Sequence, residues 1–132
     1  MRAKLKVWSR RWPLIAYWLP PVAWMALIFA LSAQPSLPEA PRPAWDLLLK
    51  KGAHMGAYAI LLLLLWRAFS HRTQCAWPVG TAFLLTVLYA ASDEFHQTFV
   101  PDRNGWIGDV MVDAVGALLG VLGVSLATRR KR

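Results

Sequence analysis

Residues 92–120 read S-D-E-F-H-Q-T-F-V-P-D-R-N-G-W-I-G-D-V-M-V-D-A-V-G-A-L-L-G. In this stretch Asp93 and Glu94 end one apolar run, whereas Asp109 and Asp113 lie inside the next. Charged groups in or near hydrocarbon cost free energy, and they are tolerated where they pair with one another or face a cavity. These four carboxylates therefore predict either a compensated polar cluster or a functional site within an apolar protein.

The rest of the chain is apolar enough for a membrane protein. Of its 132 residues, 57% are hydrophobic, which exceeds the usual share in a soluble domain. Four apolar segments are long enough to cross a bilayer, and we expect each to form a helix. The predicted fold is a single domain, residues 1–132. It is an all-α membrane protein, a four-transmembrane-helix bundle with helices at about 13–33, 52–69, 77–100 and 106–127.

The first apolar segment follows a basic start, an arrangement that also resembles a signal peptide. Its apolar run is longer than a usual signal core, which favours an uncleaved first helix. Pro20 and Pro21 are expected to kink or interrupt that helix. Four prolines within residues 34–43 then predict a short extended loop.

The distribution of basic residues predicts the orientation. With four spans, both termini lie on one side together with the loop at residues 70–76, and this side carries eleven of the 15 Lys and Arg residues. The other side carries Arg42, Lys50, Lys51 and Arg103. Cytoplasmic loops hold the excess of positive charge, so we expect both termini in the cytoplasm. All seven Asp and Glu residues then fall on the outer side or in the outer half of a helix.

Helical spacing places the polar residues of three helices on inward faces. Successive residues of an α-helix are rotated by about 100°, so Asp109, Asp113, Gly116 and Gly120 form one seam. A G-x-x-x-G pair lets another helix approach closely, and the seam is therefore expected to face the bundle interior. Lys51, His54 and Tyr58 share a face of the second helix, and Asp93 and Gln97 share a face of the third, with Glu94 beside them.

All of these polar residues share one depth, which predicts a single site. The candidate binding residues are Lys51, His54, Tyr58, Asp93, Glu94, Gln97, Arg103, Asp109 and Asp113. The catalytic candidates among them are His54, Glu94 and Asp109.

Three interpretations of this site remain open. The first is a structural network of paired charges. The second is a site that binds or transports a cationic or polar envelope molecule, or relays protons. The third is an enzyme site acting on a lipid-linked or phosphorylated substrate. In it the carboxylates, His54 and Tyr58 supply acid, base and possible metal ligands, with oxygen ligands that would suit Mg²⁺ or Ca²⁺. Lys51 and Arg103 would hold a phosphate or carboxylate.

The sequence also argues against several functional classes. It contains no contiguous metal signature such as H-E-x-x-H, and Cys75 is its single cysteine, so we predict no metal site and no cofactor. The net charge is +8, but the basic residues flank apolar runs and form no basic helix with interleaved aromatics. Membrane lipid, and not nucleic acid, is therefore the expected partner.

The pattern of the stretch 92–120 resembles the VanZ-like family of bacterial integral membrane proteins. The matching residues are Ser92, Asp93, Glu94, Gln97, Phe99, Pro101, Arg103, Asp109, Asp113, Gly116 and Gly120. Two upstream motifs fit as well, Lys51, His54 and Tyr58 in the second helix and Ile28, Phe29, Ser32, Gln34 and Pro35 at the end of the first. The resemblance covers about residues 25–123. Asp102 departs from it, because the family commonly has glycine there.

The resemblance implies a four-helix protein of the bacterial cytoplasmic (inner) membrane. The name-giving member of the family is associated with low-level resistance to the glycopeptide teicoplanin. The expected function is that of a cell-envelope membrane protein whose outward-facing polar site binds or handles an envelope precursor or small molecule. A membrane enzyme and a structural or assembly protein are the alternatives.

Overall fold

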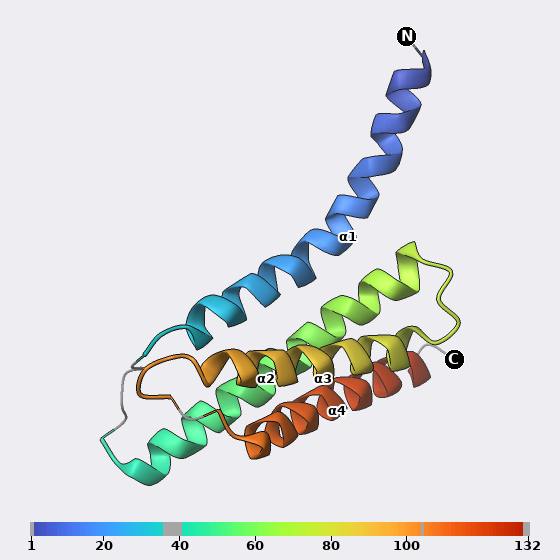
Figure 1. The fold of residues 1–132 in the computed structure, drawn as a ribbon. Helices are drawn as coiled ribbons and strands as arrows, with labels where there is room; N and C mark the ends of the chain where they lie inside the picture. Colours follow the sequence, from blue (N-terminus) through green and yellow to red (C-terminus); the bar gives the residue numbers. More distant parts are fainter. Residues whose placement is uncertain (1, 36–40, 104, 131–132) are drawn as a thin grey trace.

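Four α-helices make up the fold of the computed structural model, which describes residues 2–35, 41–103 and 105–130. The helices are α1 (Arg2–Ser32), α2 (Pro43–Arg72), α3 (Pro78–Gln97) and α4 (Ile107–Arg129) (Figure 1). The all-helical prediction is confirmed. Residues 36–40 of the predicted proline-rich loop, Asn104 and the last two basic residues lie outside the described residues.

The helix ends differ from the apolar runs that predict them. α1 begins at Arg2 and α2 at Pro43, in both cases well before the hydrophobic segment. A proline is well tolerated in the first turn of a helix, where its missing N–H has no partner to lose. α3 ends at Gln97, three residues before the predicted end at 100, and passes into a turn. A hydrophobic run predicts the part of a helix that lies in the membrane, but it does not predict where the helix begins and ends.

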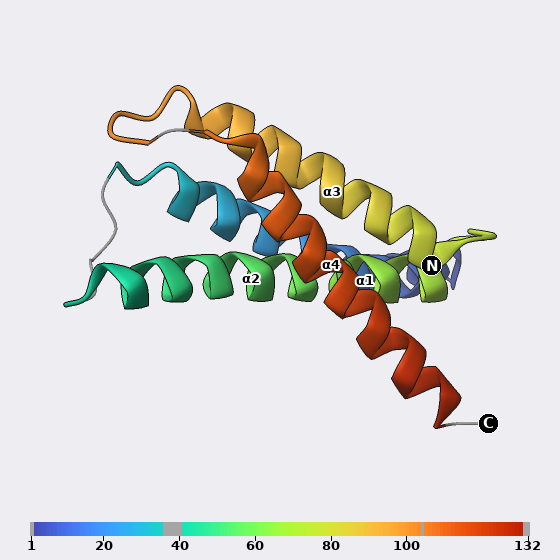
Figure 2. The same ribbon diagram turned by 90° about the horizontal axis from the view of Figure 1, so that it is seen from below.

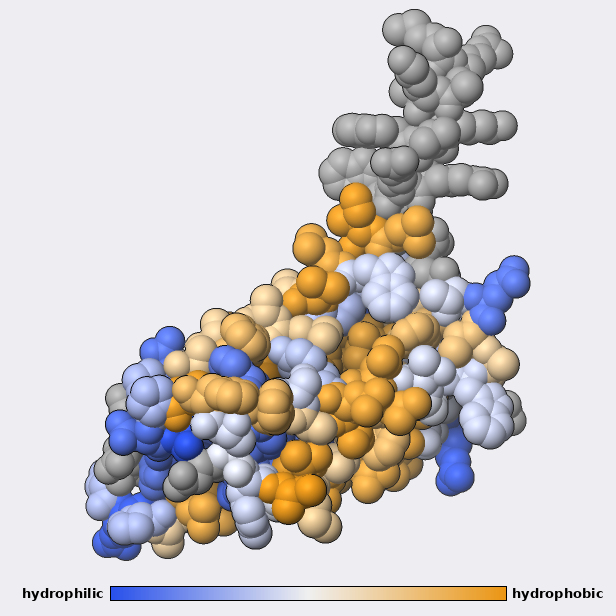
Figure 3. Space-filling view, in the orientation of Figure 1, coloured by the Kyte–Doolittle hydropathy of each residue, from blue (hydrophilic) through white to orange (hydrophobic). Residues whose placement is uncertain are grey.

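Three of the described helices are long and apolar enough to cross a membrane: α1 from Leu14 onward, α2 and α4. α3 carries the buried polar residues Asp93, Glu94 and Gln97 in its last turns and is not among the three. Large apolar side chains of α4, such as Leu118 and Leu122, are exposed. Figure 3 shows hydrophobic side chains over the middle of the visible face and hydrophilic ones at the end that holds the α1–α2 and α3–α4 connections. The chain is therefore a multi-pass membrane protein by its helix composition.

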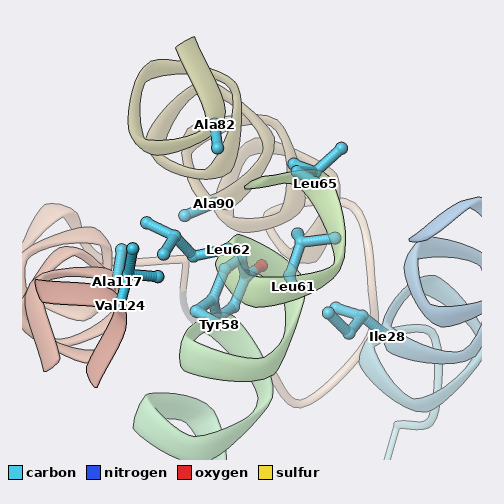
Figure 4. Close-up of a cluster of buried hydrophobic side chains, with 9 residues drawn as sticks. All are labelled: Ile28, Tyr58, Leu61, Leu62, Leu65, Ala82, Ala90, Ala117 and Val124. Atoms are coloured by element: carbon cyan, nitrogen blue, oxygen red, sulfur yellow. The ribbon is translucent and has the colours of Figure 1, made fainter. Parts of the chain in front are cut away.

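α2 lies at the centre of the bundle and packs on all three other helices. Its buried side chains provide much of the apolar core (Figure 4), which consists of Ile28, Tyr58, Leu61, Leu62, Leu65, Ala82, Ala90, Ala117 and Val124. The contributions of α3 and α4 to this core are small side chains, so their backbones lie close to α2.

α4 crosses α2 along the predicted glycine seam (Figure 2). A Cβ atom on Gly116 would lie only 2.7 Å from the Cα of Met55, and one on Gly120 would lie 2.9 Å from Cδ2 of Leu62. Asp113, Gly116 and Gly120 are all buried. The spacing predicts that the seam faces the bundle interior, and the structure places it against α2.

α1 is held against the bundle by polar contacts as well as by apolar packing. The indole Nε1 of Trp24 donates to the backbone oxygen of Ala57 at 2.9 Å, and the hydroxyl of Tyr89 donates to the oxygen of Met25 at 2.6 Å. α1 runs without a break through Pro20 and Pro21, and its ribbon bends along its length (Figure 1). The expected interruption is therefore absent from this helix, whereas the bend agrees with an expected kink.

The connection between α3 and α4 contains a tight turn. The backbone N–H of Arg103 donates to the oxygen of Val100 at 3.2 Å, and Asp102 has φ of 61°. Proline at the second position and positive φ at the third match a type II turn, in which glycine is preferred at the third position. The positive φ at this position explains why glycine is common there in the family that the sequence resembles, where this chain has Asp102.

We expect Gly116→Ala to destabilise the protein by about 1–3 kcal/mol, because a methyl group on this seam meets the backbone of α2. The measurement is thermal unfolding of the purified protein in detergent. Gly123→Ala is the matched control, since a Cβ atom there has nothing within 4 Å. Equal melting temperatures for the two variants would argue against the close approach of α2 and α4.

Candidate functional site

The polar residues of the bundle gather at the end that holds the α3–α4 turn. Helical spacing brings one polar face from each of α2, α3 and α4 to this end, and the turn adds Arg103. The side chains that meet here carry four carboxylates, two fixed positive charges and one imidazole. Their pairing shows which charges are compensated by protein groups.

Asp93 joins three helices through a single carboxylate oxygen. Its Oδ2 accepts hydrogen bonds from Ser32 Oγ of α1 at 2.7 Å, from Tyr58 OH of α2 at 3.2 Å and from Gln97 Nε2 of α3 at 3.2 Å. The side chain is 2% exposed. Hydrogen bonds from several donors stabilise a buried carboxylate and replace the water that it loses.

Arg103 extends this network to the turn. Its Nη1 donates to Gln97 Oε1 at 3.0 Å, while the amide nitrogen of Gln97 donates to Asp93. The guanidinium has five N–H groups in a planar fork, so it retains donors beyond the one bonded to Gln97.

Lys51 of α2 forms an ion pair with Asp109 in the first turn of α4. Its ammonium also lies over the ring of Trp106, 5.9 Å from the centroid, within the range of a cation–π interaction. Both charged side chains are about 30% exposed, so this pair lies at the rim of the polar cluster and not at its centre.

His54, Glu94 and Asp113 occupy the centre of the cluster. His54 Nδ1 lies 3.2 Å from Asp113 Oδ1, and the backbone N–H of Trp106 donates to Glu94 Oε2 at 3.0 Å. The second oxygens, Glu94 Oε1 and Asp113 Oδ2, are buried and have no hydrogen-bond partner among the described residues. One donor atom from each of the three residues lies within 4.8 Å of those of the other two, which is close enough to hold a metal ion.

A pocket of 260 Å³ opens between α1 and α2 beside this cluster. Its wall is mainly apolar, with Ile28 and Leu31 from α1 and Ala53 and Ala57 from α2. Four polar side chains also line it: Ser32, His54, Tyr58 and Arg103. An apolar cleft with a few convergent polar groups is the usual form of a small-molecule site.

Comparison with protein families finds a match to the VanZ/LLP1 model over residues 14–128, which is most of the chain. The chain belongs to the VanZ/LLP1 family. Comparisons with curated proteins and with solved structures find no significant match.

The structure brings all nine predicted binding residues of this VanZ/LLP1 protein to the same end of the bundle. Tyr58, Asp93, Gln97 and Arg103 form one hydrogen-bonded chain, and the ion pair, the His54–Asp113 pair and Glu94 adjoin it. The three catalytic candidates do not all lie together. Asp109 is paired with Lys51, whereas His54 and Glu94 are neighbours. Their roles in binding or catalysis stay predictions.

Two contributors to the site lie outside the predicted set. Ser32 at the end of α1 donates to Asp93, and the backbone N–H of Trp106 donates to Glu94. Ser32 does stand in the motif at the end of the first helix that resembles the family, so a signal for it was present in the sequence. The contact of Trp106 is made by its backbone N–H, so no residue type in the sequence indicates it.

Ser32→Ala is expected to destabilise the protein by about 0.5–2 kcal/mol, because it removes an interhelical hydrogen bond to a buried carboxylate. Ser92→Ala is the control, since the exposed hydroxyl of Ser92 donates only to Tyr89 O of its own helix. Thermal unfolding in detergent measures both variants. A Ser32→Ala protein as stable as Ser92→Ala would show that Asp93 does not hold α1.

Proposed function

We propose that this VanZ/LLP1 protein crosses the bacterial cytoplasmic membrane four times, with both termini in the cytoplasm. The excess of Lys and Arg at the termini and around residues 67–72 supports this orientation through the positive-inside rule. α3 is 20 residues long, which suffices for a span. Its buried polar residues have partners on α1 and α2 and in the α3–α4 connection. The polar cluster and its pocket then face the outer surface.

Membrane-impermeant maleimide tests this orientation. In a Cys75→Ser background, Arg42→Cys is expected to react in intact cells, because residue 42 precedes α2 on the proposed outer side. Thr73→Cys follows α2 and is expected to react only after the membrane is permeabilised. The reverse pattern would invert the orientation and place the pocket on the cytoplasmic side.

We infer that the pocket binds an envelope amphiphile with an anionic headgroup, a phosphate or a carboxylate. The observation that carries this proposal is the pocket wall, in which the cationic side chain of Arg103 joins a mainly apolar lining from α1 and α2. The guanidinium donors that have no partner among the described residues suit bidentate recognition of phosphate or carboxylate. The apolar walls from α1 and α2 suit a hydrocarbon chain.

Binding of an envelope lipid or lipid-linked precursor is also how a role in teicoplanin susceptibility would arise, and we include that role in the proposal. The pocket is proposed to open on the outer side of the cytoplasmic membrane. A protein that sequesters or presents a precursor there changes its availability without breaking a bond. Turnover of the bound lipid would instead support the membrane-enzyme alternative.

Arg103→Gln is expected to weaken binding of an anionic lipid by roughly tenfold, the effect of losing one charge-assisted hydrogen bond of about 1.5 kcal/mol. Native mass spectrometry of the protein released from nanodiscs measures retention of phosphatidylglycerol and of a polyprenyl phosphate, with phosphatidylcholine as the zwitterionic reference. The same lipids are recovered and examined for hydrolysis.

Arg42→Gln is the matched control, because Arg42 lies at the same end of the bundle but does not line the pocket. Equal retention of phosphatidylcholine and of the two anionic lipids by the wild-type protein would overturn the proposal. Equal losses in Arg103→Gln and Arg42→Gln would show general surface attraction and not recognition in the pocket. In cells, a deletion strain with altered teicoplanin susceptibility is expected to be restored by Arg42→Gln but not by Arg103→Gln.

A further inference from the structure

The charges of the polar cluster do not balance among its protein groups. Four carboxylates, Asp93, Glu94, Asp109 and Asp113, face two fixed cations, Lys51 and Arg103. With His54 neutral, two negative charges remain. A buried charge without a counterion is costly in an apolar environment, so protons or a bound cation must supply the balance.

The excess charge can be assigned to particular atoms. Asp109 is paired with Lys51, and one oxygen of Asp93 accepts three hydrogen bonds. Glu94 and Asp113 are only 5% and 1% exposed, and each keeps a buried oxygen without a hydrogen-bond partner in the described part of the chain. Asp93 Oδ1 is also buried and without such a partner, but three donors already stabilise the other oxygen of that carboxylate. Glu94 and Asp113 are also the ones that adjoin His54.

We propose that His54, Glu94 and Asp113 form a binding site for one divalent metal ion. The residues come from α2, α3 and α4, and each contributes one donor atom within 4.8 Å of the other two. Small side-chain rotations bring atoms at this separation to metal–ligand distances of about 2.0–2.2 Å. A divalent ion also supplies the two positive charges that the cluster lacks. The site differs from the expectation of no metal, because the three ligands are far apart in sequence and form no contiguous motif.

The types of ligand atom at this site favour some metal ions over others. One imidazole nitrogen with two carboxylate oxygens suits Zn²⁺ and Mn²⁺ better than Mg²⁺ or Ca²⁺, which prefer oxygen ligands alone. Zn²⁺ binds such a set more tightly than Mn²⁺ in the general order of metal affinities. Three protein ligands leave a coordination position open, and His54 also lines the pocket between α1 and α2. The open position is therefore expected to be reached from the pocket.

The proposed metal site does not rest on the proposed lipid function. Metal binding is measured without a lipid ligand, and the lipid assay compares variants of Arg103 and Arg42, which lie outside the metal cluster. Failure of one proposal is therefore distinguishable from failure of the other.

The test uses the full-length, tag-free protein in detergent, stripped with a chelator and then equilibrated with Zn²⁺. Elemental analysis is expected to find one Zn²⁺ per chain, and the melting temperature is expected to rise with Zn²⁺ concentration because the ion binds only the folded state. Glu94→Gln and Asp113→Asn are expected to lower the affinity at least tenfold. Co²⁺ provides a spectroscopic readout, and its visible absorption in the wild-type protein is expected to be lost in His54→Ala.

Two controls remove the same types of ligand elsewhere. His71→Ala removes a histidine at the opposite end of α2, and Asp102→Asn removes an exposed carboxylate from the turn; both are expected to retain the ion. A wild-type protein that binds no Zn²⁺ overturns the proposal and leaves protonation as the source of charge balance. Binding that survives Glu94→Gln and Asp113→Asn, or that is lost equally in His71→Ala, also overturns it. If a variant fails to fold, the Zn²⁺ stoichiometry and the melting-temperature shift of the wild-type chain decide whether the metal site exists.

Discussion

The carboxylate of Asp93 is the constraint on which the arrangement of the bundle depends. An ionised group at this depth needs hydrogen-bond donors, because the hydrocarbon around the bundle offers none. The donors come from Ser32, Tyr58 and Gln97, which lie on three different helices. The hydrogen bonds to this one oxygen therefore hold the end of α1, the middle of α2 and the last turns of α3 together. Apolar packing alone is less specific, since lipid tails are as apolar as the side chains that they replace.

The close approach of α4 to α2 also fixes the positions of other residues in the polar cluster. Gly116 lies against the backbone of Met55, and Met55 follows His54 directly in α2. Asp113, one turn before Gly116 in α4, is thereby brought to hydrogen-bonding distance of His54. A larger residue on the seam would separate the helices and with them the two side chains. The glycine seam is thus part of the polar site as well as of the packing.

The sequence predicts the helices and the composition of the site for different reasons. Apolar runs locate the helices because hydrophobicity is a strong local signal, and rotation per residue assigns Asp113 and Gly116 to a common inward face. Partnerships between helices are not local, so nothing in the sequence distinguishes Asp109, which is paired with Lys51, from Asp113, which is paired with His54. The sequence does not indicate the proximity of His54, Glu94 and Asp113 for the same reason. Three ligands on three helices have no common spacing.

The structural and binding interpretations of the polar cluster share residues, because Ser32, Tyr58 and Arg103 belong to the hydrogen-bonded network and also line the pocket. Ser32 shows how they are connected, because it donates to Asp93 and also lines the pocket between α1 and α2. The hydrogen bond that docks the end of α1 therefore also places one wall of the pocket. Beyond that contact, much of α1 presents exposed apolar residues such as Leu19, Val22 and Leu27. In the proposed function, a pocket wall that is held by a few polar contacts and otherwise faces lipid would admit a hydrocarbon chain from the bilayer, and Arg103 at the turn would contact its headgroup.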